Sequence, residues 1–354
     1  MAFLKVDNVS IKGISACVPP SVEENKDIPF YAPGEAEQII AATGIERRHI
    51  AGPDICVSDL CFGAAERLLE ELGWEKDSID LLALCTQNPD YRNQPTSFLV
   101  HERLGLNESV MCLDFFHGCP GWVMSLSSVS SMLSASGLKR ALLLVGDTVS
   151  KDQNQASHES RPLFGDACTA TALEFDPAAP AMLFNNGTMS DGGKALIITQ
   201  GGYRHPYTHE TLDIEIARRN GTLSVRQTDD MDGMDVFSFA ITKVPKALKK
   251  LCTEFSLDIE EVDCLILHQA NKLIVDAIAK RLKMPANKVP VGLRQFGNTA
   301  SASIPLTIVS ECADAYRSGK QKSLVCGFGT GLSWGSAYIE TNHIVVPEVV
   351  IYQS

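Results

Sequence analysis

One cysteine, Cys119, stands where the sequence would place a reactive nucleophile. It lies in the glycine-bounded turn 118–121, between an apolar run at 111–116, typical of a buried strand, and a small-residue helix expected to begin near Pro120. Free backbone N–H groups and the positive end of the helix dipole favour a thiolate there, and the thiolate is the nucleophile. We therefore predict that Cys119 attacks substrates, whereas Cys112 in the same run only packs.

Two further residues with useful chemistry lie in the second half of the chain. His268 ends an apolar run at 262–267, and Asn298 follows a glycine in a turn that opens a small-residue helix. Taken separately, His268 could be a hydrogen-bonded core residue and Asn298 a helix cap. A glycine-rich turn at 326–335 follows another expected strand and offers free backbone N–H groups to an oxyanion. Together with a cysteine nucleophile, these features predict chemistry at an acyl carbonyl.

Strands and helices alternate along the chain, and one pattern of them occurs twice. The segments 79–87 and 141–146 have similar sequences to 262–270 and 323–327, and the two pairs are separated by nearly the same number of residues. Apolar strands separated by helices indicate an α/β fold with a parallel sheet. Because ligands bind at the carboxyl ends of parallel strands, we expect residues from both halves to face one central site.

The composition limits the kind of protein and its partners. The 354 residues carry a formal net charge of −12 and can form one large domain or two of medium size. The charge disfavours nucleic acid, and an acidic carrier protein would need a local basic patch. Eleven cysteines without CxxC pairing indicate reduced thiols, without disulfides or a zinc site. With no membrane-spanning stretch and no secretory signal pattern, we expect a cytoplasmic protein that does not bind membranes.

We expect the chain to have four parts. The irregular stretch 185–234 is typical of a substrate lid or of a solvated insertion, and the sequence favours neither. His205 and His209 are four residues apart there, but no helical pattern or carboxylate supports a metal site. The apolar tail could be an edge strand or a dimer contact. The expected parts are 1–175 with Cys119, a cap or insertion at 176–235, 236–345 with His268 and Asn298, and the tail at 346–354.

Five motifs together resemble the ketoacyl-acyl-carrier-protein synthase III family, whose members have the thiolase fold. The resemblance runs from about Lys5 to Tyr338, and the cysteine, histidine and asparagine occur in the family's order. It implies a duplicated α/β fold of five layers, αβαβα, and a homodimer. The motifs are GCPGW at 118–122, FGDACTA at 164–170, HQAN at 268–271, FGNTASAS at 296–303 and FGTGLSWGSA at 328–337.

The resemblance also implies a reaction and a role for each residue. Cys119 takes the acyl group from an acyl-CoA or acyl-carrier-protein donor, while His268 and Asn298 bind the thioester carbonyl of malonyl-acyl-carrier protein. Loss of CO₂ leaves an enolate, which two neutral donors can stabilise, and the enolate attacks the acyl-cysteine to give a 3-oxoacyl-acyl-carrier protein. By alignment, the backbone N–H groups of Cys119 and Thr330 form the oxyanion hole. We expect no cofactor and no metal, and the acyl-carrier protein as partner.

The sequence departs from this family pattern at positions that would contact substrates. Family members that take acetyl-CoA often have a tryptophan at the position of Gln38 and arginines at those of Ala42 and Leu273, so CoA recognition through those contacts is not expected. Phe116 and His117 replace small residues beside the nucleophile, where they reshape the acyl pocket or only fill core. The remaining candidate anchors for phosphates or a carrier protein, or else a solvated helix face, are Lys272, Lys280 and Arg281.

Three other interpretations use the same residues. An acyltransferase of this fold could pass the acyl group from Cys119 to an alcohol or amine, but such a transfer does not need Asn298 beside His268. Papain-like hydrolases also order cysteine, histidine and asparagine in this way, but their signature around the cysteine is absent. A non-catalytic partner subunit would usually have lost one of the three residues. Decarboxylative condensation is therefore the predicted reaction, with acyl transfer as the alternative.

Overall fold

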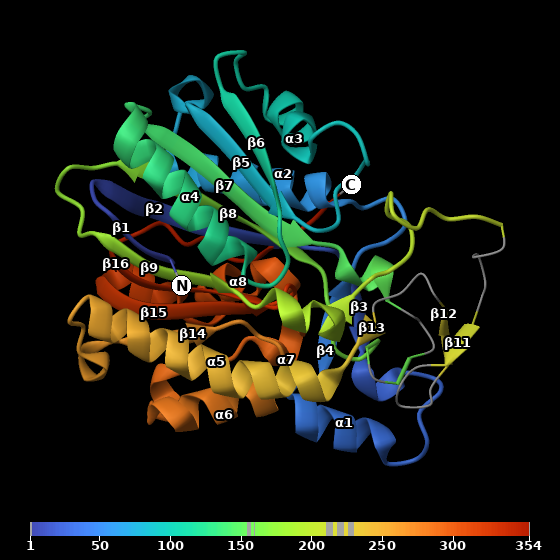
Figure 1. Cartoon of the computed structure of the whole chain (residues 1–354). Helices are drawn as coiled ribbons and strands as arrows, with labels where there is room; N and C mark the ends of the chain where they lie inside the picture. Colours follow the sequence, from blue (N-terminus) through green and yellow to red (C-terminus); the bar gives the residue numbers. More distant parts are fainter. Residues whose placement is uncertain are drawn as a thin grey trace.

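The chain folds into five layers of alternating helices and sheets. Figure 1 shows α4 between the two large sheets and α5 and α6 on the lower side of the second sheet. This is the αβαβα arrangement that the resemblance implies, so the predicted fold class is confirmed. The computed structural model describes residues 2–153, 157–158, 160–209, 215–217, 223–225 and 230–353, so part of the expected cap at 176–235 lies outside the described residues.

The first sheet has six strands and is mixed. Strands β6 and β7 lie parallel to β5, whereas β8 is antiparallel to both β7 and β2. The prediction of a parallel sheet is therefore wrong, because β8 follows β7 through a loop instead of a crossover helix. In order across the sheet the strands are β17 (Val350–Ile351), β2 (Val9–Val18), β8 (Ala167–Phe175), β7 (Arg140–Asp147), β5 (Leu81–Thr86) and β6 (Met111–Phe116).

The second sheet has five strands and repeats part of the first. Its parallel neighbours β14 and β15 correspond to β5 and β7, so the repeat seen in the sequence is a repeated strand pair. Strand β9 lies within the range expected for the cap, and the N-terminal strand β1 pairs with it. In order the strands are β1 (Ala2–Val6), β9 (Met182–Thr188), β16 (Ser333–Asn342), β15 (Lys320–Gly329) and β14 (Cys264–Leu267).

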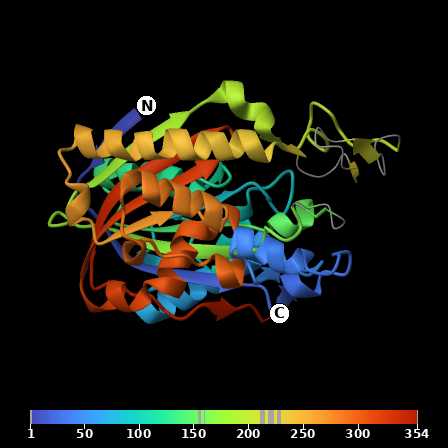
Figure 2. The same cartoon turned by 90° about the horizontal axis from the view of Figure 1, so that it is seen from below.

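Three pairs of helices form the other layers, and a separate apolar core lies in each region where they meet the sheets. The middle pair is α4 (Gly121–Ser136) and α8 (Ser303–Glu311). In α4, buried Ser125 and Ser130 each donate to a carbonyl four residues earlier at 2.6 Å, so small polar residues fit between two sheets without unpaired hydroxyls. The outer pairs are α2 (Val57–Leu72) with α3 (Thr96–Leu104), and α5 (Gly233–Glu254) with α6 (Lys272–Leu282), which lie side by side in Figure 2.

The remaining helices and strands are short. They are α1 (Glu35–Thr43), β3 (Ser21–Glu24), β4 (Arg47–Ile50), η4 (Ser190–Ala195), β10 (Leu196–Ile197), β11 (Glu215–Ala217), β12 (Leu223–Val225), β13 (Asp230–Met231), α7 (Leu293–Phe296), η7 (Ala300–Ala302) and α9 (Ala313–Ser318).

One edge of the first sheet differs from expectation, and the other agrees with it. Strand β6 has the predicted bounds, but it is the outermost strand and its side chains are exposed or half-buried, so the prediction of a buried strand is wrong. The apolar sequence of β6 predicts burial incorrectly, because hydrophobic periodicity does not distinguish a central strand from an edge strand. The apolar tail contributes β17, which pairs with β2, so the edge-strand alternative is confirmed.

Candidate active site

Cys119 lies inside the turn 118–121 that joins β6 to α4, two residues before the helix begins. The turn is closed by a 2.7 Å hydrogen bond from the Gly121 N–H to the Gly118 carbonyl. A Cβ at Gly329 of β15 would lie 2.8 Å from the Cys119 Sγ, so only glycine lets the second half approach the sulfur this closely. The predicted turn and helix start therefore place Cys119 where the two halves meet.

Burial and nearby groups shift the pKa of the Cys119 thiol. Burial is the main cause that raises the pKa of its thiol to about 12, and the charge of Asp147 raises it further. Backbone N–H groups of Thr330 and of Cys119 itself hydrogen bond to the sulfur and lower the pKa, but by less. Burial therefore opposes the thiolate that the helix terminus favours, and the side chain rests as a thiol at neutral pH.

The imidazole of His268 is buried and neutral. Its Nδ1 lies 2.7 Å from the Ser303 Oγ, which fixes the orientation of the ring. Burial lowers its pKa to about 3, and a hydrogen bond to the backbone carbonyl of Ala300 raises the pKa by less. At physiological pH the ring therefore acts as a neutral hydrogen-bonding group and carries no charge.

Asn298 is held by its backbone and by its side chain. Its N–H donates to the Leu163 carbonyl at 2.8 Å, and its carbonyl accepts from the Gly165 N–H at 3.1 Å. Its Oδ1 accepts from the Ala300 N–H at 3.0 Å. Because the oxygen is occupied, the NH₂ group is the end of the carboxamide that can donate to a substrate.

Ala300 brings these three groups together. Cys119 and Ala300 belong to one small buried cluster, the Ala300 carbonyl accepts from His268, and the Ala300 N–H donates to Asn298. Ala300 has a φ of 45°, a left-handed conformation that is uncommon for alanine. Strained backbone of this kind persists where the surrounding structure imposes it, often at functional sites.

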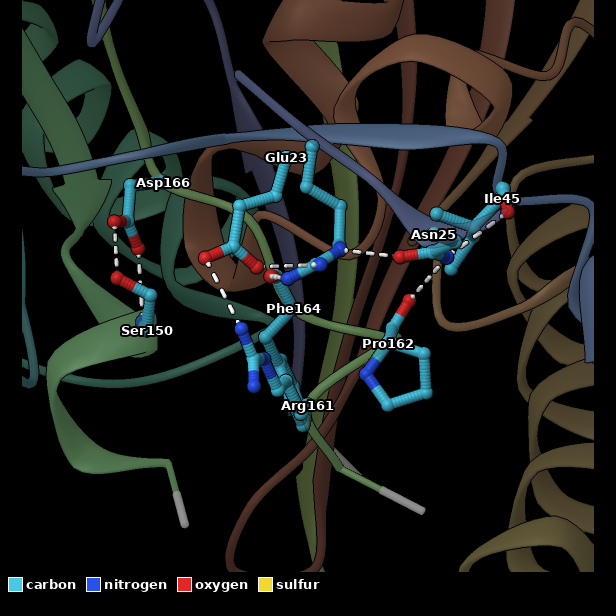
Figure 3. A network of polar contacts seen from close by, with 9 residues as sticks. Glu23, Asn25, Ile45, Ser150, Arg161, Pro162, Phe164 and Asp166 are labelled. Carbon is cyan, nitrogen blue, oxygen red and sulfur yellow. Dashed lines mark hydrogen bonds and ion pairs between the residues drawn. The ribbon is translucent and has the colours of Figure 1, made fainter. Parts of the chain in front are cut away.

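A buried arginine positions the segment that pairs with Asn298. Arg48 on β4 donates to the Phe164 carbonyl at 3.2 Å, to Asn25 Oδ1 at 2.8 Å and to Glu23 Oε2 at 3.0 Å; Figure 3 labels these three partners. Phe164 forms an isolated β-bridge with Asn298. Arg48 thus acts on the site through the backbone of the FGDACTA motif.

A cavity of ≈ 1200 Å³ opens between α1, η4 and α5, and Cys119, His268 and Asn298 are not among its lining residues. Leu163 and Leu332 line it, and Leu163 also packs against the Cys119 cluster. Ala42, at a position where many relatives that take acetyl-CoA carry an arginine, is part of the lining, and Gln38 is exposed on the same helix. The charged residues of the lining are Asp191, Lys194, Asp232, Asp235 and Lys243, so carboxylates outnumber amines.

The predicted basic anchors do not form one cluster. Lys272 begins α6 and forms an ion pair with Asp276, and Leu273 beside it is exposed. Lys280 and Arg281 lie at the other end of the helix, about 13 Å from Lys272 along its axis. The structure therefore offers two separate positive positions.

The two predicted pocket residues next to the nucleophile differ in exposure. Phe116 is 80% exposed on the edge strand, so it does not fill the core of its own chain. His117 is half-buried, and burial lowers the pKa of its ring. His205 and His209 are exposed, and no group of three or more potential metal ligands occurs among the described residues.

Three residues of the site were missed from the sequence. Ser303 and Arg48 carry no signal of their own, because their partners lie far away in the sequence. Asp147 could have been noticed, since an acidic residue at the carboxyl end of a buried strand is unusual.

Chains with two such halves and a buried cysteine between them form the thiolase-fold class of acyl-transferring and condensing enzymes. The chain matches the family models "3-Oxoacyl-[acyl-carrier-protein (ACP)] synthase III" over residues 113–192 and "3-Oxoacyl-[acyl-carrier-protein (ACP)] synthase III C terminal" over 252–341. It is 34% identical to a beta-ketoacyl-[acyl-carrier-protein] synthase III of Desulfitobacterium hafniense, over 94% of this chain and 98% of that protein. The chain belongs to the 3-oxoacyl-[acyl-carrier-protein] synthase III family.

Solved structures agree with this assignment. A crystal structure of 3-oxoacyl-(acyl-carrier protein) synthase from Burkholderia xenovorans superposes with a TM-score of 0.92 at 32% identity and covers 98% of both chains. The enzyme from Thermus thermophilus superposes with a TM-score of 0.79 at 30% identity, over 93% of this chain and 98% of that one. Within the described residues, none of the helices has the length and apolar character needed to cross a membrane.

Proposed function

We propose that the protein carries out a decarboxylative Claisen condensation between an acyl group on Cys119 and malonyl-acyl-carrier protein. The observation that supports this most is the meeting of Cys119, His268 and Asn298 around the backbone of Ala300, in a chain of the synthase III family. The product is a 3-oxoacyl-acyl-carrier protein. The site does not support transfer of the acyl group to an alcohol or amine, since that reaction does not need both His268 and Asn298 as hydrogen-bond donors.

In the first step the Cys119 sulfur attacks the thioester of the acyl donor. A new C–S bond forms, the donor's C–S bond breaks, and the proton of the Cys119 thiol ends on the departing thiol. The oxyanion of the tetrahedral intermediate is stabilised by the backbone N–H groups of Cys119 and Thr330, both of which contact the sulfur in the resting state. A backbone donor serves this role with any side chain, so Thr330 is compatible with it.

In the second step the malonyl group loses CO₂ and its electron pair passes into the thioester carbonyl. The neutral His268 ring and the Asn298 NH₂ group donate to that oxygen while negative charge develops on it. The enolate carbon then bonds to the acyl carbon, and the Cys119 sulfur leaves and takes up a proton. Bond making and breaking balance without a cofactor or a metal.

The carrier protein binds next to the outer helices α5 and α6 in this proposal. Lys246, Lys249, Lys250 and Arg281 line a groove of ≈ 470 Å³ between the two helices. The whole chain has a formal net charge of −12, so such a cluster of cations is a local exception. Opposite charge would steer an acidic carrier protein to this face and away from the rest of the surface.

The active unit in this proposal is a homodimer formed through β6. This strand pairs only with β5 among the described strands, and it exposes Met111 and Phe116. Exposed apolar edge strands pair with other chains, and a two-fold axis lets the same edge serve both copies.

Intact-protein mass spectrometry tests the proposed nucleophile. Incubation with a series of acyl-CoA and acyl-carrier-protein donors is expected to add one acyl mass to the wild type and none to Cys119→Ala. The matched control Cys112→Ala, on the neighbouring strand, is expected to keep the adduct. Addition of malonyl-acyl-carrier protein should then release CO₂ and the 3-oxoacyl product. An adduct that persists in Cys119→Ala contradicts the assignment.

A further inference from the structure

The glycine directly before the nucleophile leaves room for two polar side chains. A Cβ at Gly118 would lie 2.5 Å from the Gln87 Oε1 and 3.0 Å from the Thr330 Oγ1, so any other residue here would displace the Gln87 carboxamide. Gln87 follows β5 in the first half of the chain, and Thr330 follows β15 in the second. Polar atoms from both halves therefore lie around one point beside Cys119.

The backbones that carry these two side chains are fixed by hydrogen bonds. The Gln87 N–H donates to the Asp147 Oδ1 at 2.8 Å, and the Thr330 carbonyl accepts from the Ser333 hydroxyl at 2.5 Å. The Thr330 N–H also contacts the sulfur of Cys119. Both side chains therefore extend from well-defined positions on either side of the nucleophile turn.

The polar ends of the two side chains have no partner in the described part of the chain. Neither the Gln87 carboxamide nor the Thr330 hydroxyl hydrogen bonds to another group there, although both residues are half-buried. Together they offer donors and acceptors without any charge. A substrate that displaces water from such groups has to replace the lost hydrogen bonds.

The other glycine of the turn, Gly121, faces the opposite side of the nucleophile. A Cβ at Gly121 would lie 3.2 Å from the Ser301 Cβ, and Ser301 follows Ala300, whose backbone holds both proposed donors to the malonyl carbonyl. That side serves the extender. The Gly118 side, with the oxyanion-hole N–H of Thr330, is therefore left for the acyl group.

We propose that Gln87 and Thr330 are specificity-determining residues that bind a neutral hydrogen-bonding substituent, such as a hydroxyl, near the thioester of the acyl group. The inference rests on the proposed role of Cys119 as the acylated nucleophile. A plain alkyl chain takes water from both side chains and returns no hydrogen bond, so it reacts more slowly. A carboxylate substituent is also disfavoured, because the carboxylate of Asp147 lies directly behind Gln87.

Acylation rates with three thioesters of N-acetylcysteamine test the proposal. The butyryl, 3-hydroxybutyryl and succinyl thioesters have carbon chains of equal length and lack both nucleotide and carrier protein, so only the acyl substituent differs. Intact-protein mass spectrometry over time gives kcat/KM for acylation of Cys119. We expect the 3-hydroxybutyryl thioester to react at least about tenfold faster than the other two, which corresponds to one net hydrogen bond. Equal rates, or a preference for butyryl or succinyl, overturn the proposal.

Two variants remove the polar atoms while nearly keeping the side-chain shape. Gln87→Met and Thr330→Val are each expected to lower the 3-hydroxybutyryl rate at least about fivefold and to leave the butyryl rate within about twofold of the wild type. Gln353→Met, on the exposed C-terminal tail, is the matched control and should keep the wild-type preference. A purely structural role would lower both rates by the same factor, and that result overturns the proposal.

The same measurement separates this proposal from the proposed function. A wild type that forms no adduct with any of the three thioesters contradicts the acylated nucleophile, and the specificity role of Gln87 and Thr330 with it. Adducts that form on Cys119 at equal rates with all three thioesters support the nucleophile and overturn the specificity role alone.

Discussion

The backbone N–H of Ala300 donates to the Oδ1 of Asn298 at 3.0 Å, and this bond decides which end of the carboxamide faces a substrate. Because the oxygen is engaged, the NH₂ group is presented as a donor, as stabilisation of an enolate requires. The carbonyl of the same alanine contacts the ring of His268. One peptide segment therefore orients both proposed donors, and its geometry leads to the predictions below.

Loss of either proposed donor should separate the two steps of the reaction. His268→Ala and Asn298→Ala are expected to acylate Cys119 at near the wild-type rate. Their release of CO₂ from malonyl-acyl-carrier protein should fall at least about 100-fold, the typical effect of losing one donor to a developing oxyanion. Radiometric CO₂ release and intact mass measure the two steps. Asn93→Ala, in an exposed loop, serves as control, and wild-type CO₂ release in either active-site variant would contradict the condensing mechanism.

The left-handed backbone at Ala300 should make this position sensitive to side-chain shape. Ala300→Gly is expected to change the free energy of unfolding by no more than about 1 kcal/mol, since glycine adopts φ of 45° freely. Ala300→Val should destabilise by about 2 kcal/mol or more, because a β-branched side chain opposes this conformation. Urea denaturation measures both. Equal stability of the two variants would show that the backbone at this position is not strained.

Removal of the buried guanidinium should affect both stability and the site. Arg48→Ala leaves Asn25 and the Phe164 carbonyl without their donor, so we expect a loss of about 3 kcal/mol in the free energy of unfolding. CO₂ release should also fall, since Phe164 pairs with Asn298. Arg67→Ala, which breaks two exposed ion pairs, with Glu70 and Glu71, should cost less than about 1 kcal/mol. Similar losses in the two variants would contradict the positioning role.

Acid should destabilise the protein through His268. Its pKa is about 3 when folded and 6.5 ordinarily, so between these values the unfolded chain binds a proton that the folded chain does not. The free energy of unfolding is therefore unaffected by His268 above pH 6.5 and decreases as the pH falls from 6.5 towards 3. Stability measured by urea at pH 7 and pH 5 should therefore drop by about 2 kcal/mol less in His268→Gln than in the wild type. His343→Gln, on the surface, should match the wild type, and an unchanged drop in His268→Gln would mean that the ring is charged in the fold.

The proposed dimer should depend on one edge of the first sheet. Phe116→Lys places a charge on the exposed edge of β6 and is expected to give a monomer in light scattering after size exclusion. Ile351→Lys places the same charge on β17, at the opposite edge of the same sheet, and should leave the dimer intact. A monomeric wild type, or equal effects at the two edges, would exclude β6 as the interface.

Local features of the chain could be predicted well where short-range chemistry decides them. Helices α1 and α3 end at Gly44 and Gly105, which are both left-handed, and a left-handed glycine stops a helix whatever surrounds it. The repeat of β5 and β7 in β14 and β15 was also visible, since both copies are buried and therefore share an apolar pattern.

Residue types and their spacing identify the reactive groups: a cysteine before a helix, a histidine after a strand and an asparagine in a glycine turn. The protonation and exposure of these groups depend on the folded arrangement of the two halves. Burial between the two sheets raises the pKa of Cys119 and lowers that of His268, so both side chains are uncharged at neutral pH. The order of strands in the first sheet, in contrast, leaves Phe116 exposed on an edge strand. The reason is that desolvation and the distance between charges depend on neighbours that are remote in the chain, and no local pattern of residues records them.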